Sequence, residues 1–262
     1  MRIPCWRIPC WRIVMLCSVA MAAAIDLSAD ERATHNLAER SFPARTTCRL
    51  ASEVPVIDGR LDEPVWQSVK WSAPFVDIRG GSHPAPPLRT RMKLLWDKDH
   101  LYIAADLEEP HVWGTVRPRD AIVFHDNDFE VFIDPNGDGR EYYEVEINAL
   151  NTIFDLFLVR SYNDGGPALH GWDLKGLKTA VHVNGTLNDG SDRDDGWQLE
   201  MALPWSALKE AAGTAAPPRP NDVWRMNFSR VEWQHRITDG RYEKLPGTRE
   251  ENWVWSPQGK IN

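Results

Sequence analysis

The sequence is poor in three features that would each define a class of protein. Only four of its 262 residues are cysteine and three of those lie near the N-terminus, which argues against a disulfide-stapled fold. Thirty basic residues face 38 acids, and the net charge of −8 disfavours a nucleic-acid binder, which needs a basic surface. The eight histidines are scattered, and neither a zinc-type cluster nor a serine or cysteine nucleophile motif is apparent.

The chain begins with the pattern of a secretory signal. Three arginines and no acid precede an apolar run from Ile13 to Met21, and alanines follow at 22–24. The run is too short for a permanent membrane anchor. We therefore expect cleavage after Ala24 and a secreted or periplasmic product, without a membrane anchor, whose charge is −11 and whose single thiol is Cys48. The alternative is an anchored protein, held either by the uncleaved segment itself or by a lipid attached to Cys17.

Beyond this segment, the pattern of hydrophobic residues indicates one β-rich domain. Residues 25–48 show no sustained period and are expected to form a flexible leader, and residues 49–262 are expected to form a single, monomeric domain. Nine strands are predicted, at 91–96, 101–105, 128–134, 142–150, 152–160, 177–183, 196–203, 223–233 and 252–255. Helix is scarce, with one short candidate at 204–210. This spacing predicts an all-β, antiparallel sandwich with little helix.

Two of these strands carry an unusual set of polar residues. Alternation places Phe129 and its apolar partners on one face of 128–134, and Glu130 on the other. On 142–150 the same rule groups Glu144, Glu146 and Asn148. If the strands form a hairpin, these acids and the amide lie on one face together with aromatic rings. No lysine or arginine of the two strands lies on that face. Such a surface suits a polyol, although a plain solvated face accounts for the same pattern.

The turn between these strands resembles the opening of a calcium loop. Asp134, Asn136 and Asp138 offer oxygen atoms at alternate positions, and Gly139 takes the sixth position. The usual closing glutamate is absent, because Val145 stands in its place. Calcium held by Asp134, Asn136 and Asp138 is thus one interpretation, and an ordinary turn made of good turn-forming residues is the other.

Five segments together resemble the carbohydrate-binding module family 9-like domain: IDGRLDEPVW at 57–66, LLWD with LYI at 94–103, DFEVFID at 128–134, YYEVEIN at 142–148, and GWQLE with PW at 196–205. The resemblance covers about residues 49–262. It implies an immunoglobulin-like or jelly-roll sandwich, an association with xylanases, and binding of sugar chain ends between two rings. It also suggests that the chain ends before the last strand of the family.

Carried over residue by residue, the resemblance assigns a sugar site. It implies that Glu130 and Asn148 form hydrogen bonds with the sugar, and that Glu146 stands where the family has an arginine. One stacking tryptophan falls on Phe124, and the other would lie beyond Asn262. Arg230 interrupts an apolar strand face, and we expect it to contact either the ligand or a carboxylate such as Glu130.

The sequence therefore predicts a non-catalytic domain that binds plant-type polysaccharide or oligosaccharide, such as xylan or cellulose fragments. An accessory glycoside hydrolase of the endo-1,4-β-xylanase type is the alternative, with candidate acids at Glu130, Glu144, Glu146 and Glu200. Nothing in the sequence indicates that any of these acids is buried enough to keep a proton at neutral pH. A haem-carrying relative is a third possibility, since some redox domains share this sandwich.

Overall fold

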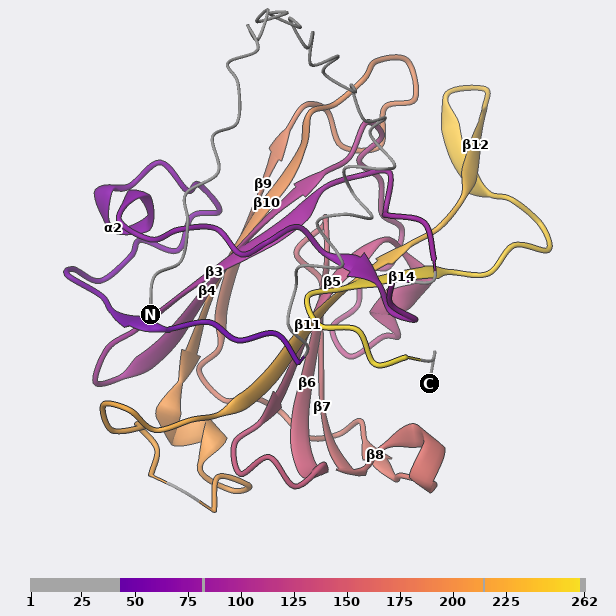
Figure 1. The fold of residues 1–262 in the computed structure, drawn as a ribbon. Coiled ribbons are helices and arrows are strands. Elements are labelled where there is room, and N and C mark those ends of the chain that lie inside the picture. The colour runs from indigo at the N-terminus through magenta and orange to yellow at the C-terminus, as the bar shows by residue number, and fades with distance from the viewer. Residues whose placement is uncertain (1–42, 82, 214, 260–262) are drawn as a thin grey trace, which may run out of the picture.

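The computed structural model describes residues 43–81, 83–213 and 215–259, which form two stacked β-sheets (Figure 1). The predicted signal segment 1–24 and residues 25–42 of the predicted leader lie outside this described part. Within it, no helix has the length and apolar character needed to cross a membrane.

The first sheet has five strands, three from residues 49–108 and two from residues 178–204. Its order is β1 (Arg49–Leu50), β3 (Thr90–Trp96), β4 (His100–Glu108), β10 (Gly196–Pro204) and β9 (Lys178–Asn184). All its neighbours pair antiparallel except β1 and β3, which are parallel.

The second sheet has seven strands and includes the two strands that carry the predicted polar face. Its order is β2 (Val76–Asp77), β14 (Glu251–Val254), β11 (Arg225–Glu232), β5 (Asp128–Asp134), β6 (Arg140–Asn148), β7 (Ile153–Arg160) and β8 (Ala168–Leu169). A separate hairpin of β12 (His235–Thr238) and β13 (Arg241–Lys244) extends away from both sheets in Figure 1.

All nine strands predicted from alternation are present, and the prediction of an antiparallel β-sandwich is confirmed. The remaining described strands have two to four residues, which is too short for a period of two to be recognised. Among residues 43–81, 83–213 and 215–259, helix is limited to α2 (Pro64–Gln67) and three 3-10 turns, η1 (Val123–His125), η2 (Tyr162–Asp164) and η3 (Trp205–Leu208). The predicted helix at 204–210 is therefore only the single turn η3.

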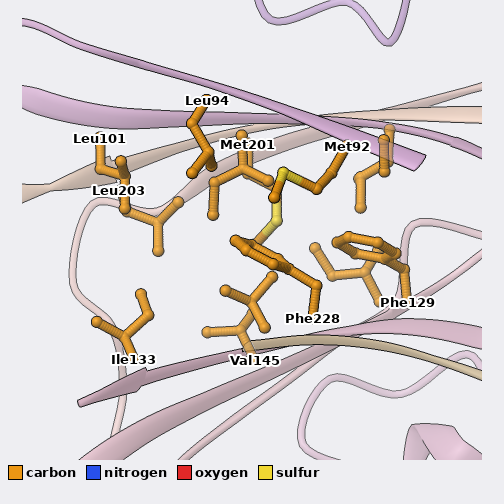
Figure 2. Packing of buried hydrophobic residues seen from close by; sticks show 14 of the residues in the cluster. Met92, Leu94, Leu101, Phe129, Ile133, Val145, Met201, Leu203 and Phe228 are labelled. Atoms are coloured by element: carbon orange, nitrogen blue, oxygen red, sulfur yellow. The ribbon is translucent and has the colours of Figure 1, made fainter. Parts of the chain in front are cut away.

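The main core lies between the two sheets. Figure 2 shows Met92, Leu94 and Met201 of the five-stranded sheet facing Phe129, Val145 and Phe228 of the seven-stranded sheet. Each is almost fully buried. Burial of a side chain of this size contributes about 1.5–3 kcal/mol, so the core accounts for why alternate residues on these strands are apolar.

A second, smaller core covers the outer face of the five-stranded sheet and explains the segment 57–66. Glu200 on β10 accepts hydrogen bonds from the indole Nε1 of Trp66 and from the backbone amides of Asp58 and Gly59, at 2.6, 3.0 and 2.8 Å. Gly59 has φ +86°, and a Cβ there would lie 2.6 Å from the backbone nitrogen of His182. Glu200 thus holds this segment against the sheet and does not face a cavity.

Candidate ligand-binding site

The outer face of the seven-stranded sheet carries a cavity of about 330 Å³. Strands β5, β6, β7, β11 and β14 supply its floor, and η1, η2 and the ends of neighbouring loops supply its rim. The residues that line it include four aromatic rings and four carboxylates, which are Phe124, Phe132, Phe154, Tyr162, Glu130, Glu144, Glu146 and Glu250.

The pairing of β5 with β6 brings the predicted acids together. Glu130 lies directly opposite Glu146, and Glu144 lies opposite Phe132, all on the face away from the core. The predicted division of the two strands into an apolar and a polar face is confirmed. None of the described residues lining the cavity is lysine or arginine.

Burial of these acids changes their protonation. Loss of solvent raises the pKa of Glu130 to about 7 and, together with the charge of Glu130, raises the pKa of Glu144 to about 8. The pKa of Glu146 is raised well above its ordinary value by burial and then by Glu130 and Glu144. Carboxyl groups of this kind keep protons near neutral pH and can both donate and accept hydrogen bonds. This burial was not predicted from the sequence.

Two of the acids also position the rim. An oxygen of Glu146 accepts a hydrogen bond of 3.0 Å from the backbone amide of Phe124, and Glu144 accepts one of 2.9 Å from the hydroxyl of Tyr162. The carbonyl of Phe124 in turn accepts from the indole Nε1 of Trp233 at 2.8 Å. Phe124 is therefore held at the edge of the cavity with its ring half-buried, at the place predicted for a stacking ring.

One acid of this group, Asp128, was missed in the sequence. It lies on the same outer face as Glu130, is 0% exposed, and neither of its carboxylate oxygens makes a well-formed hydrogen bond to a described residue. Its pKa is raised by burial and by Glu130 and Glu146, and the backbone amide of Val231 offsets only part of the rise. The period of two that selected Glu130 also places Asp128 on that face, so the signal was present.

Asn148 lies on the predicted face but does not line the cavity. Its amide nitrogen donates to the carbonyl of Val116 and to Asp126, and its oxygen accepts from the amides of Leu150 and Thr152. All four of its hydrogen-bonding positions are therefore used within the protein. The prediction of Asn148 as a sugar contact needs correction, because a loop covers this end of the strand and the side chain holds that loop.

Arg230 lies on the opposite face from the cavity. It is 1% exposed and forms ion pairs of 2.7 Å with both Glu109 and Glu232. Glu130 pairs with Ser229, the neighbour of Arg230, so the two side chains point to opposite sides of the sheet. The expectation of a structural ion pair is therefore confirmed, with Glu109 and Glu232 as the partners. The contact expected with Glu130, or with a ligand in this cavity, is wrong.

The turn at 134–139 is held by its own hydrogen bonds. The two oxygens of Asp134 accept from the amides of Gly137 and Gly139. The side-chain oxygen of Asn136 accepts from the amide of Asp138, whose oxygens accept from the amide of Arg140 and the side chain of Asn136. Each side-chain oxygen is thus used within the turn. These bonds explain the sequence pattern without a metal, so calcium at Asp134, Asn136 and Asp138 stays a prediction.

Comparison with known proteins identifies relatives for most of the domain. The family model described as carbohydrate family 9 binding domain-like matches residues 57–228. Endo-1,4-beta-xylanase A of Thermoanaerobacterium saccharolyticum is 25% identical over 161 residues, which are 61% of this chain and 12% of the xylanase. Exoglucanase XynX of Acetivibrio thermocellus is 25% identical over 175 residues, 66% of this chain and 14% of the exoglucanase. The chain thus spans about an eighth of the length of these relatives.

A likeness to a solved structure supports the same fold. The family 9 carbohydrate binding module of Caldicellulosiruptor kristjanssonii, solved in complex with glucose and with cellotriose, superposes with a TM-score of 0.50 at 17% identity. The superposition with the glucose complex covers 78% of this chain and 83% of the module. At this identity the likeness concerns the sandwich alone.

Proposed function

The chain belongs to the carbohydrate family 9 binding domain-like family, and from this premise we propose that it is a non-catalytic domain that binds a saccharide. The proposed site is the cavity on the outer face of the seven-stranded sheet. The observation that carries the proposal is that buried carboxyl groups and aromatic rings line one cavity to which no described lysine or arginine contributes.

The chemistry of this lining matches a sugar. Each sugar hydroxyl both donates and accepts, and the carboxyl groups of Glu130 and Glu146 can pair with it in either role. The half-buried ring of Phe124 is suited to cover the apolar C–H face of a pyranose. The ligand class is proposed from the relatives, which are named as enzymes of xylan and glucan breakdown, and from the module solved with glucose and cellotriose. We propose xylan or cellulose fragments.

Hydrolysis is disfavoured by the geometry of the acids. Glu130 and Glu146 are cross-strand neighbours on the cavity floor, and each has a carboxylate oxygen within 4.8 Å of the other. Glycosidases place their two carboxyl groups on either side of the scissile bond, whereas these two come side by side from adjacent strands of one floor. Glu200, the remaining candidate, is buried against Trp66 on the other sheet. We therefore expect no release of reducing sugar from xylan or cellulose.

Calorimetric titration of the protein with glucose, cellotriose and xylobiose tests the proposal. We expect heat of binding with at least one of them, and a loss of affinity of about tenfold in Phe124→Ala, since stacking on a ring is worth about 0.5–1.5 kcal/mol. Trp71→Ala is the control, because Trp71 is a half-buried ring on the outer face of the other sheet. Absence of heat with every sugar, from folded protein, would contradict the proposal.

Export completes the proposal. We infer from residues 1–24 that the mature chain begins at Ile25 and is secreted or periplasmic. We also propose that it is monomeric. N-terminal sequencing of the product and its elution volume in gel filtration test these points. A product that starts at Met1 in the cytoplasm would contradict export.

A further inference from the structure

Three carboxylates at the floor of the cavity lie close enough to repel one another strongly when they are ionised. One oxygen from each of Asp128, Glu130 and Glu146 lies within 4.8 Å of the other two. The residues are 0, 7 and 2% exposed, so water screens them little. The charges that raise their pKa values belong to carboxylates, namely to one another and to the neighbouring Glu144 and Glu250.

Asp128 supplies an independent reason to expect a ligand. Its two oxygens are buried and make no well-formed hydrogen bond to a described residue. Asp126, two residues earlier, is equally buried but accepts hydrogen bonds from both the amide and the hydroxyl of Thr115, from the amide of Val116 and from Asn148. Buried polar groups in proteins almost always have such partners. The amide of Val231 is the one described donor near Asp128 and forms no well-aligned hydrogen bond with it, so Asp128 indicates a missing partner.

We propose that Asp128, Glu130 and Glu146 hold a hard divalent cation, of the calcium class, at the floor of the cavity. Calcium binds oxygen ligands at about 2.3–2.6 Å, so ligand atoms on opposite sides of the ion are about 4.6–5.2 Å apart. The separations in this group lie within that limit. A set made only of carboxylates favours calcium, magnesium or manganese over zinc, which prefers histidine and cysteine.

This site differs from the turn at 134–139 in the hydrogen bonding of its side-chain oxygens. The side-chain oxygens of the turn are used in hydrogen bonds, whereas those of Asp128 are not. Glu130 and Glu146 line the cavity, so water in the cavity can complete the coordination shell. The inference goes beyond saccharide binding and does not depend on it, because the cation is tested without sugar.

Calcium chloride titrated into the chelator-treated full-length protein tests the inference. We expect one ion bound per chain by calorimetry. With calcium at about 100 times its dissociation constant, we expect Tm to rise by about 5 °C, because an ion that binds only the folded state stabilises it. Asp128→Asn keeps the shape of the side chain and removes its charge, so we expect the calcium shift to disappear while the Tm in chelator rises, since repulsion is relieved.

Asp138→Asn in the turn is the matched control and should keep the full calcium shift. Glu146→Gln provides a second variant if Asp128→Asn does not fold, and it too should lose the shift. Calcium, magnesium and manganese that give neither heat nor a Tm shift with the parent protein would overturn the inference. A shift that survives in Asp128→Asn and Glu146→Gln but is lost in Asp138→Asn would also overturn it, because the ion would then sit in the turn.

Discussion

The two faces of the seven-stranded sheet bury acids in different ways. On the inner face, Arg230 directs its guanidinium at Glu109 and Glu232, and its remaining donors reach Thr90 and the carbonyl of Glu108. On the outer face of the same strands, the acids around Glu130 have no described cation among the residues lining the cavity. A buried acid with a matched partner serves the fold, and an acid without one indicates a place for a ligand or a proton.

Burial disfavours the ionised form even of an acid that forms an ion pair on the inner face. One guanidinium serves two carboxylates on the inner face, and burial with the neighbouring charge of Glu109 raises the pKa of Glu232 to about 8 despite Arg230. The side-chain amide of Asn127 helps by donating to Glu232 at 2.8 Å. Acids on both faces thus have raised pKa values, and Glu144 and Glu146 on the outer face also accept hydrogen bonds. Asp128 differs from all of them, because no described side chain donates to it.

The largest effect is expected from removing the cation of the inner face. Arg230→Met leaves Glu109 and Glu232 buried without their partner, so we expect the free energy of unfolding to fall by about 4 kcal/mol. Urea denaturation measures this change. Arg236→Met is the control, because its pair with Glu243 is exposed and should cost less than about 0.5 kcal/mol. Equal losses in the two variants would remove the distinction between the faces.

A smaller loss is expected where the partners of the acid are neutral. Glu200→Ala removes the acceptor of the Trp66 indole and of two backbone amides, and leaves these donors buried. We expect a loss of about 3 kcal/mol, since each buried donor without a partner costs about 1–3 kcal/mol and some will reach water. Near-ultraviolet circular dichroism should also lose part of the signal of the rigid Trp66. An unchanged urea midpoint would show that segment 57–66 is held by its apolar contacts alone.

A change of opposite sign is expected on the outer face. Glu144→Gln removes one titratable carboxyl from the acidic group, and the new amide oxygen can still accept from Tyr162. We expect the protein to gain about 1 kcal/mol at neutral pH in the presence of chelator, because Glu144, whose pKa burial raises to about 8, must take up a proton on folding and glutamine need not. Urea denaturation of the variant beside the parent protein decides the sign. A loss as large as that of Arg230→Met would mean that Glu144 has a cationic partner.

The fold was predictable from alternation, but partners across space were not. The period of two on the predicted strands 128–134 and 142–150 assigned Glu130 and Glu146 to the correct faces, because one face of each predicted strand is fully apolar. The same rule placed Arg230 inward with Phe228, which is correct. Its actual partner Glu109 follows β4 in the opposite sheet, 121 positions away, and no local pattern shows which strand will lie above it.

Coverage by loops was the other feature that the sequence did not reveal. Asn148 was assigned to the site because it shares a face with Glu146, yet the loop before β5 folds over that end and uses all its hydrogen bonds. Tyr162 and Phe154 were missed because they come from outside the two predicted strands. Strand faces follow from side-chain periodicity, whereas the walls of a cavity depend on tertiary packing.

The smallest effect is expected in the pH dependence of stability at Glu200, which is held by neutral donors and not by a positive charge. Burial raises the pKa of Glu200 to about 7, and the hydrogen bonds from Trp66, Asp58 and Gly59 offset only part of the rise. The folded protein therefore binds more protons at this position than the unfolded chain, whose glutamates titrate near about 4.3. Stability contributed by Glu200 is then fully present below that value and is lost as the pH rises through about 7.

The comparison of the parent protein with Glu200→Gln isolates this effect, since the acids of the cavity titrate equally in both. Urea denaturation between pH 5 and pH 8 should show the advantage of the parent protein declining as the pH rises. A difference that stays constant across this range would mean that the three N–H donors stabilise the ionised carboxylate as fully as a guanidinium does. In that case, the absence of lysine and arginine from the described lining of the cavity would no longer set the carboxylates around Glu130 apart from Glu200. Only the missing hydrogen bonds of Asp128 would do so.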